Sequence, residues 1–317
     1  MAPPDPTEAR FPTVPAAAGH YESFYLKACH PERPLALWIR YTVHKRPGAE
    51  PTGSLWFTLF DGDAAGPRAQ KSTLPAVGAG GGAWISVGEA SMGPGRASGS
   101  IDGVDWELRF EGREPALFHL PSDWMYRTRL PRTKLVSPVP AARFDGSVSV
   151  DGRAIAVDAW RGMVGHNWGA QHAERWIWLH GLTESGDWID AAIAKVRVGP
   201  LVTPWVASGA ISIGGTRHAL GGPGRRPQAR EAADRCAFEV SSRKLRVRGE
   251  VEAARKDVVG WIYADPDGSE HNTLNCSIAD MRLRVEGQEL VVRGSAAYEL
   301  GMREDDHGIP VQPFPDG

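Results

Sequence analysis

Tryptophans and histidines crowd one stretch of this sequence, AWRGMVGHNWGAQHAERWIWLHG (159–181), which holds four tryptophans and three histidines. Imidazole exchanges a proton near neutral pH and is a common zinc ligand. Indole rings provide large apolar surfaces whose faces attract positive charge. The stretch therefore predicts the packed centre of a β-protein, a metal site, or the lining of a pocket for an apolar ligand.

The metal alternative is the weakest of the three. His166, His172 and His180 are separated by six and eight residues, which matches no standard metal motif. The glycine cluster GAGGGAWISVG (78–88) lacks the spacing of a dinucleotide-binding loop. We predict no metal and no organic cofactor, and we expect the histidines to be hydrogen-bonded residues of a pocket or a core.

Carboxyl groups near the aromatic runs are candidate acids. A carboxyl group that is buried among indole rings has a raised pKa, so it can stay protonated near pH 7 and act as a general acid. The candidates are Glu22, Glu174, Asp187 and Asp190. For each of them, a salt bridge or exposure to solvent is the alternative.

Strand alternation sorts these residues onto faces. In RWIWLHG (175–181) the tryptophans and His180 share one face, and in DWIDAAIAKV Trp188 shares a face with Asp190. If the two strands form a hairpin around residues 184–187, the aromatic face is a cavity wall or a barrel lumen, and the other face is core. The alternative is that both faces are buried between two sheets.

The elements that must hold these residues are short strands. The chain contains 37 glycines and 25 prolines, and segments of alternating polarity such as LALWIRYTV (35–43) recur at hairpin spacing. Asp102-Gly103 and Asp151-Gly152 are typical of tight hairpin turns. Roughly fifteen strands of this kind predict an all-β protein of the sandwich or barrel class.

The similar order of hairpins in the two halves predicts two related β-barrel domains. The proline-rich segment 113–142 is weakly patterned and is expected to cross between them, with a boundary near residue 135. The expected organisation is a flexible N-terminus, two β-domains and a C-terminal tail, with bounds 1–18, 19–135, 136–302 and 303–317.

Composition excludes several classes of protein. A chain of 317 residues with 42% hydrophobic content can bury a sizeable core. Its formal net charge of −2 provides no broad basic surface for nucleic acid. No apolar run reaches the roughly 18 residues of a membrane span, so at most peripheral membrane contact is expected. Three widely separated cysteines, and an N-terminus without an apolar signal segment, predict a cytoplasmic location.

The pentapeptide GHNWG (165–169), followed closely by an aromatic strand, resembles the carotenoid 1,2-hydratase and hydroxyneurosporene synthase group, together with the AttH-like proteins. The segments YESFYLKACHPERPLALWIRYT (21–42), ASGSIDGVDWELRF (97–110) and NCSIADMRL (275–283) support the likeness in the expected order. The likeness thus covers most of the chain. More remotely, the sequence is similar to tocopherol cyclase and to lipocalin-like fungal Diels–Alderases.

The resemblance implies two lipocalin-like antiparallel β-barrel (calycin-type) domains that pack together, with an apolar ligand pocket in or between them. It also implies acid-initiated addition to a polyene double bond, closure of an isoprenoid ring, or shape-guided pericyclic closure. These reactions need an apolar cavity and a few well-placed donors. No metal or organic cofactor is implied.

One position departs from the family pattern. The carotenoid hydratases place an acidic residue directly before His-Asn-Trp-Gly, whereas this chain has Gly165 there. The resemblance then implies that another acid, Asp190 or Glu22 by preference, takes this role, or that the chemistry differs.

The enzyme hypothesis assigns roles to these residues. The candidate catalytic residues, which supply or orient a proton, are Asp190, Glu22, His166 and His180. The candidate binding residues for an apolar isoprenoid- or polyene-like molecule are Asn167, Trp168, Trp176, Trp178, Trp188, Tyr21 and Tyr25. For Asn167 and Gly169, the alternative is that they shape a turn after the preceding strand.

Two other hypotheses remain open. A carrier of a lipid or terpenoid has the same pocket without chemistry, and its pocket acids are paired with arginines such as Arg40, Arg161 or Arg175. A structural protein uses its tryptophans to join the barrels and has no open cavity. An unpaired carboxyl at the pocket floor separates the enzyme from the carrier. Open volume beside Trp176 and Trp178 separates both from the structural protein.

Overall fold

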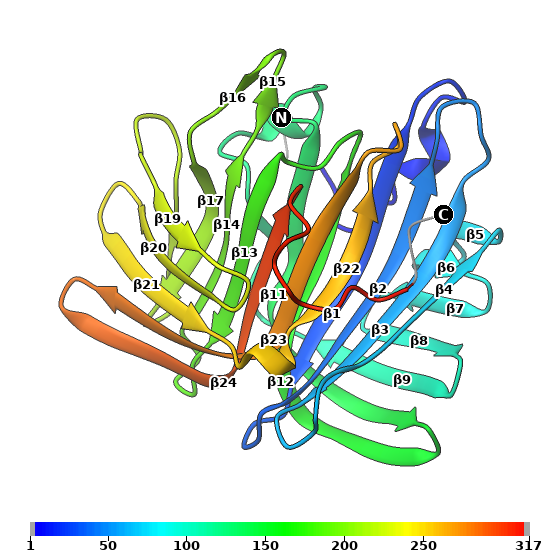
Figure 1. Cartoon of the computed structure of the whole chain (residues 1–317), viewed down its shortest axis with the longest axis horizontal. Helices are drawn as coiled ribbons and strands as arrows, with labels where there is room; N and C mark the ends of the chain where they lie inside the picture. The colour runs from blue at the N-terminus through cyan, green and yellow to red at the C-terminus, as the bar shows by residue number, and fades with distance from the viewer. Residues whose placement is uncertain (1–3, 314–317) are drawn as a thin grey trace.

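A computed structural model describes residues 4–313, which form two antiparallel β-sheets (Figure 1). The twelve strands of the first sheet are β1 (His20–Cys29), β2 (Leu35–Lys45), β3 (Thr52–Asp61), β4 (Arg68–Leu74), β5 (Val77–Gly80), β6 (Ala83–Val87), β7 (Ala90–Gly93), β8 (Arg96–Ile101), β9 (Val104–Glu111), β10 (Leu117–Phe118), β11 (Thr133–Val150) and β12 (Arg153–Gly169). The ten strands of the second sheet are β13 (Arg175–Leu182), β14 (Trp188–Lys195), β17 (Val206–Ile213), β18 (Thr216–Ala219), β19 (Gln228–Glu231), β20 (Arg235–Ser241), β21 (Arg246–Glu252), β22 (Val259–Ala264), β23 (Glu270–Val285) and β24 (Gln288–Met302).

The remaining elements are small. The strands β15 (Arg197–Val198) and β16 (Leu201–Val202) form a separate hairpin, and there are three short 3-10 helices, η1 (Phe11–Thr13), η2 (Asp123–Tyr126) and η3 (Arg255–Asp257). Residues 4–313 contain no α-helix, so the all-β prediction is confirmed. No helix in this range has the length and apolar character needed to cross a bilayer.

Both sheets follow the same circuit of strands. The order is β4-β3-β2-β1-β12-β11-β9-β8-β7-β6-β5 in the first sheet and β18-β17-β14-β13-β24-β23-β21-β20-β19 in the second. In each sheet, the first and the last strand along the chain pair with each other in the middle of the order: β1 with β12, and β13 with β24. The two strands at the edges of each sheet, β4 and β5 or β18 and β19, are consecutive in the chain. This is the order of an up-and-down barrel. The prediction of two related, lipocalin-like barrels is therefore confirmed at the level of the fold.

The two sheets meet at a different place in the sequence from the expected domain boundary. β11 and β12 pair with strands of the first sheet, so the sheets divide at residues 170–174 and not near 135. Pro138 and Pro140 lie inside β11, where the pairing with β12 shifts register between Val136, Val139 and Ala142. Proline is tolerated in a strand at such irregularities. These prolines interrupt the alternating pattern, which made the segment look like a crossing.

The structure confirms the two hairpin turns that the Asp-Gly pairs of the sequence predict. The β8–β9 turn has Asp102 and Gly103 at φ 29° and 76°, and the β11–β12 turn has Asp151 and Gly152 at φ 51° and 79°. Two successive positive φ values are those of the hairpin turn that favours Asp-Gly. The GHNWG residues lie within β12 rather than in a turn.

β2 is buried on both of its faces, because the first barrel packs against the second sheet. Leu37, Ile39 and Tyr41 point into the first barrel. Trp38 points the other way, and its ring centroid lies 6.4 Å from that of Trp261 in β22. The outer face of the first barrel and the second sheet therefore share one apolar cluster.

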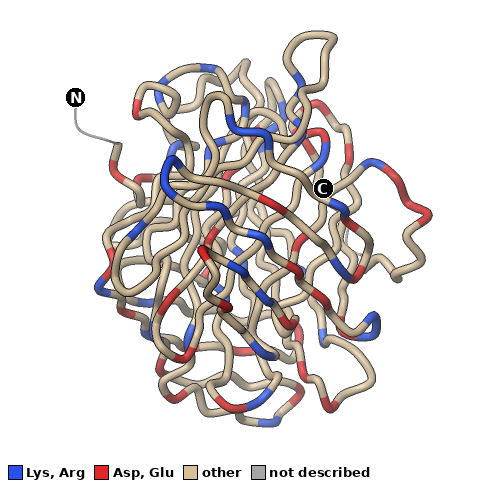
Figure 2. The backbone as a smooth tube through the Cα atoms, turned by 90° about the vertical axis from the view of Figure 1, so that its left-hand side faces the viewer, with Lys and Arg blue, Asp and Glu red and all other residues tan. Residues whose placement is uncertain are grey.

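The outer surface carries charges of both signs, and the structure describes the chain from residue 4 to residue 313. Along the strands on the left side of Figure 1, basic and acidic residues are interleaved (Figure 2). The expected flexible N-terminus is described from residue 4 and is hydrogen-bonded to β1, whereas the expected tail is described only to residue 313. The remaining residues of both segments, 1–3 and 314–317, lie outside the described part. Cys29, Cys236 and Cys276 are free and buried.

Candidate functional site

A cavity of about 490 Å³ lies between the two sheets, beside Trp176 and Trp178. β1 and β2 contribute Tyr25, Trp38 and Arg40 to its wall, and the second sheet contributes the two tryptophans and several other residues. Alternation along β13 explains why the tryptophans reach it, since the intervening Ile177 and Leu179 are packed in the core. Of the predicted aromatic face of the β13–β14 hairpin, Trp176 and Trp178 thus line a cavity wall.

The one acidic residue in this wall among the described residues is Glu299 of β24. Its carboxylate accepts hydrogen bonds from Trp176 Nε1 at 2.8 Å, from Tyr263 Oη at 3.2 Å and from Asn275 Nδ2 at 3.1 Å. Among the described residues, no arginine lies within ion-pair distance of Glu299. Glu299 therefore lacks the arginine partner that the carrier hypothesis predicts, and its recorded partners are all uncharged donors.

A buried guanidinium group faces the same cavity. Arg40 is 5% exposed, and its guanidinium carbon lies 4.2 Å from the ring centroid of Tyr263. Its Nε donates to Ser23 Oγ at 3.0 Å, and Ser23 in turn donates to Asn167 Oδ1 at 2.8 Å. Arg40 Nη1 is buried without a hydrogen-bond partner among the described residues. A buried donor of this kind is costly unless something binds to it, so Arg40 Nη1 is a candidate binding group for an oxygen atom of a ligand.

His172 is a candidate base in the cavity wall. Its Nδ1 and its backbone N–H both lie 2.7 Å from Asp265 Oδ1. An ionised carboxylate can only accept, so Nδ1 carries the proton and the lone pair is on Nε2. Nε2 has no partner among the described residues. This is the arrangement of a carboxylate-oriented general base.

The pKa values of the two groups support that assignment. Burial lowers the pKa of His172 below its usual value, although Asp265 opposes this effect. Burial also opposes ionisation of Asp265, but hydrogen bonds from His172 and His271 outweigh it and hold the pKa of Asp265 well below its usual range. At neutral pH the imidazole is therefore an uncharged base beside a charged carboxylate.

His172, Asp265 and His271 also bring three potential metal-ligand atoms within 4.8 Å of one another. Each oxygen of Asp265 already accepts two hydrogen bonds, from His172 at Oδ1 and from His271 and Ser269 at Oδ2. The outer nitrogens of both histidines lack the acceptor that usually orients a metal-bound imidazole. The donor set fits a hydrogen-bonded base better than a metal centre.

Tyr25 occupies the position next to Gly165. The two residues are paired across β1 and β12, and a Cβ atom at residue 165 would overlap the ring and the hydroxyl group of Tyr25. Burial raises the pKa of Tyr25 well above its usual value, so the phenol stays protonated. The phenol of Tyr25 thus occupies the space beside residue 165 from the neighbouring strand.

Asp190 and His180 lie behind the wall rather than in it. Asp190 accepts from Trp178 Nε1 at 3.0 Å and from Ser137, and His119 lies 3.5 Å away. Burial would raise the pKa of Asp190, but His119 and the hydrogen bonds lower it to about 2. Of the two alternatives for Asp190, a protonated acid or a paired carboxylate, these contacts favour the carboxylate, because its partners outweigh its burial.

His180 faces a second cavity of about 480 Å³ together with Lys27. Its Nε2 lies 3.0 Å from the carbonyl oxygen of Pro140, and its Nδ1 lies 3.3 Å from Lys27 Nζ. Burial and the lysine lower the pKa of His180 to about 4. The side chain is thus neutral and fully engaged at neutral pH.

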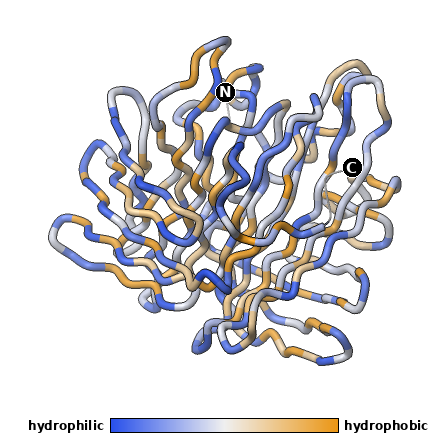
Figure 3. The backbone as a smooth tube through the Cα atoms, in the orientation of Figure 1, coloured by the Kyte–Doolittle hydropathy of each residue, from blue (hydrophilic) through white to orange (hydrophobic). Residues whose placement is uncertain are grey.

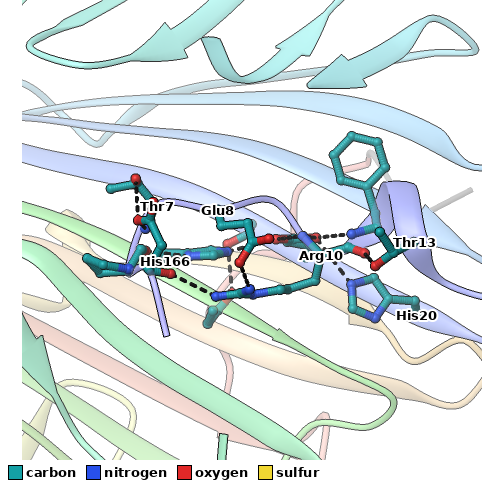
Figure 4. Close-up of polar contacts among 12 residues, drawn as sticks. Thr7, Glu8, Arg10, Thr13, His20 and His166 are labelled. Atoms are coloured by element: carbon teal, nitrogen blue, oxygen red, sulfur yellow. Dashed lines mark hydrogen bonds and ion pairs between the residues drawn. The ribbon is translucent and has the colours of Figure 1, made fainter. Parts of the chain in front are cut away.

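The N-terminal segment is held by His166, which is labelled in Figure 4, and by Glu22. The Glu22 carboxylate accepts the backbone N–H groups of Arg10 at 2.8 Å and Phe11 at 2.7 Å, and it lies 2.8 Å from His166 Nε2. His166 Nδ1 lies 2.8 Å from the carbonyl oxygen of Pro6. Burial opposes ionisation of Glu22, but His166 and His20 lower its pKa to about 2. These two candidates form an anchor for residues 6–11, outside the cavity wall.

The remaining predicted residues divide into two groups. Tyr25, Asn167, Trp176 and Trp178 line the cavity. Trp168 follows the cavity residue Asn167 in β12 and so lies on the opposite face, where it packs against Tyr126 and Val136. Trp188 packs against Leu117 and Ala210. Tyr21 does not line the cavity. Its hydroxyl group is hydrogen-bonded to Thr133, and its ring stacks on that of His172 with the ring centroids 3.9 Å apart.

Sequence reasoning missed Asp265, Tyr263 and Glu299, and it treated Arg40 and His172 only as an ion-pair partner and a pocket histidine. Tyr263 and Asp265 alternate at the end of β22, which was visible as the run VVGWIYADP. Nothing local in the sequence connects this run to His172, which is 93 residues away.

Comparisons with known proteins place the fold. No family model matches the sequence. Over 309 residues the chain is 28% identical to an uncharacterized protein of Mycobacterium tuberculosis, which matches alike in strains CDC 1551 / Oshkosh and ATCC 25618 / H37Rv, with 93% of this chain and 90% of the relative covered.

Two solved structures resemble the whole chain. An AttH candidate from Nitrosomonas europaea superposes with a TM-score of 0.59 at 12% identity, covering 96% of this chain and 99% of that one. Kievitone hydratase from Nectria haematococca superposes with a TM-score of 0.54 at 10% identity, covering 92% and 90%. At these identities the likeness shows a shared two-sheet, lipocalin-like fold.

Proposed function

We propose that the chain binds an apolar small molecule with one polar oxygen group in the cavity between the sheets, and that it adds water to a double bond of that molecule or removes it again. The observation that carries this proposal is the unpartnered Nε2 of His172, held by Asp265 in the wall of an aromatic cavity. The hydratase with the same fold supports the reaction class, and isoprenoid- or polyketide-like molecules are the substrate class proposed.

His172 acts as the base in this mechanism. Its Nε2 takes a proton from water as the oxygen atom bonds to carbon, and the resulting imidazolium is stabilised by Asp265. The π-electron pair moves toward the substrate's oxygen group, where Arg40 Nη1 binds the developing negative charge. The neighbouring carbon then takes a proton from the imidazolium. The proton lost by water thus returns to the product.

The aromatic wall and Tyr25 position the substrate. A cavity of about 490 Å³ is in the size range of pockets for small organic ligands. The hydroxyl group of Tyr25 remains protonated and donates a hydrogen bond, but its raised pKa makes it a poor acid toward an isolated double bond. The geometry therefore favours base-assisted addition to a conjugated double bond over acid-initiated attack on a polyene.

A carrier is the second candidate function. It is favoured by the hydrogen bonds that three uncharged donors make to Glu299, even though no arginine of the described residues pairs with this acid. Cyclisation needs the same cavity without a water molecule. Hydration changes the mass of the recovered compound, whereas a cyclase gives a new compound of unchanged mass and a carrier returns the original ligand.

The test uses the purified protein with a panel of prenylated enones, geranylgeranyl compounds, carotenoids and fatty acids in water enriched in oxygen-18. Addition of labelled water, detected by mass spectrometry, supports the proposal. A product of unchanged mass indicates a cyclase, and bound ligand recovered intact indicates a carrier; both results contradict hydration.

Replacements of His172 and Asp265 test whether His172 acts as the base. Replacement His172→Gln should lower kcat by about a hundredfold or more with little change in ligand binding, and Asp265→Asn should lower it by about tenfold or more. His218→Gln on β18 is the matched control and should behave as the unaltered protein. Because the neutral imidazole is required, the rate should rise with pH through the lowered pKa of His172 and level off by neutral pH. A rate that falls as pH rises from 5 to 7 contradicts the assignment.

A further inference from the structure

The exposed large apolar side chains of the described residues gather in two segments. They are Trp124, Leu130, Val198, Leu201, Val202 and Val206, and they are 41 to 72% exposed. The first two lie on the loop around η2, and the others on the β15–β16 hairpin and the start of β17. The hairpin projects at the top of Figure 1, and much of it is coloured as hydrophobic in Figure 3. Scattered apolar residues are ordinary on a surface, but a concentration of this kind marks an interaction site.

The same segments open the cavity to solvent. Met125 and Pro131 line the cavity beside exposed Trp124 and Leu130, and Val206 both lines it and is 43% exposed. A third segment, which contains Arg225, lines it from the loop between β18 and β19. We name segments 120–132, 195–206 and 222–227 the rim.

The rim carries a charge opposite to that of the whole chain. Its basic residues are Arg127, Arg129, Arg132, Lys195, Arg197, Arg225 and Arg226, and its one acidic residue is Asp123. Glu174 lies 3.0 Å from Arg197 and offsets one of these charges. The chain as a whole has a net charge of −2, so the rim has an excess of basic residues that the whole chain does not have.

We infer that the rim docks on the surface of an anionic phospholipid bilayer, with its apolar tips inserted at the headgroup boundary and the cavity mouth facing the lipid. Exposed aliphatic and indole side chains surrounded by arginines are the chemistry of interfacial binding. A neutral protein surface would satisfy the apolar tips but not the basic residues. The inference rests on the proposed function only in that the bilayer would be the source of the apolar ligand.

The experiment is co-sedimentation of the full chain with ligand-free vesicles of phosphatidylcholine alone, or with one quarter phosphatidylglycerol, at low and high salt. The unaltered protein should sediment with the anionic vesicles and be released by high salt. Trp124→Ser combined with Leu201→Ser should lower the vesicle partition coefficient by about tenfold or more, and Arg129→Gln with Arg226→Gln should do the same.

The matched control is Arg282→Gln with Arg284→Gln, which removes two exposed arginines from the outer face of β23 and should leave sedimentation unchanged. Sedimentation equally lowered by the control pair, or no sedimentation by the unaltered protein, overturns the inference. The inference is also overturned if the protein forms a dimer in solution that the Trp124 and Leu201 replacements dissociate, and the vesicles do not bind the protein. His172→Gln should sediment normally, so a failure of the proposed reaction leaves this result intact.

Discussion

Hydrogen-bond partners, more than burial, set the charge of the acidic residues at the centre of this molecule. Glu22, Asp190 and Asp265 are all fully buried, which by itself favours the protonated form. Each instead has at least one histidine beside it, and the pKa of each lies below its usual value. The sequence identified Glu22 and Asp190 but not Asp265, and main partners such as His166 and His172 are distant in the chain from their acids, so the direction of these pKa shifts could not be predicted.

Gly165 and Tyr25 provide a prediction about a single contact. Gly165→Ala should lower the free energy of unfolding by roughly 1–3 kcal/mol, because the new methyl group overlaps the tyrosine ring. Tyr25→Ala should remove most of this cost in the double variant, as measured by urea unfolding. Tyr25→Phe retains the ring and should not relieve it. Equal relief by Ala and Phe would mean that the hydroxyl group, not the ring, is the point of conflict.

At the scale of elements, alternation and turn residues predicted what lies within one hairpin. The faces of β13 and the Asp-Gly turns follow from local patterns, and the structure agrees with them. The site depends on contacts between sheets, such as that of His172 with Asp265 and that of Arg40 with Tyr263. Such contacts produce no periodic pattern in the sequence, so only aromatic residues of the wall, such as those of β13, could be predicted.

The N-terminal segment is an element held by one buried carboxylate. Glu22→Gln places an N–H group opposite the backbone N–H groups of Arg10 and Phe11, so we expect a loss of about 3 kcal/mol in the free energy of unfolding. Limited proteolysis should then cut residues 4–14 faster than in the unaltered protein.

Glu8→Gln is the control for this prediction, because Glu8 contacts Arg10 at the surface and should matter little. Unchanged proteolysis of the Glu22 variant would show that the apolar side chain of Phe11, which is also buried, holds the segment alone.

At the scale of the whole molecule, the buried ionisable groups make stability depend on pH in one direction. The carboxyl groups with lowered pKa contribute stability above their unfolded pKa near 4, and this contribution is lost as pH falls toward 2. His180, with a pKa of about 4, stays neutral in the fold while the unfolded chain takes up a proton below pH 6.5. Both effects destabilise the fold in acid.

We therefore expect the free energy of unfolding to fall by several kcal/mol between pH 7 and pH 3.5, as measured by urea titration at fixed ionic strength. His180→Gln should flatten the part of the curve between pH 6.5 and pH 4. A stability that is level or rising over that interval in the unaltered protein would contradict the burial of an uncharged His180.

The shared position of Tyr25 and Gly165 also has an evolutionary consequence. Residues 25 and 165 lie opposite each other on adjacent strands, and the volume between them has room for only one large side chain. Substitutions at the two sites should therefore show strong epistasis: a lineage with an acidic residue at 165 should have a small one at 25. A change from one arrangement to the other must pass through an intermediate in which both are small, and so move the polar side chain from one strand to its neighbour.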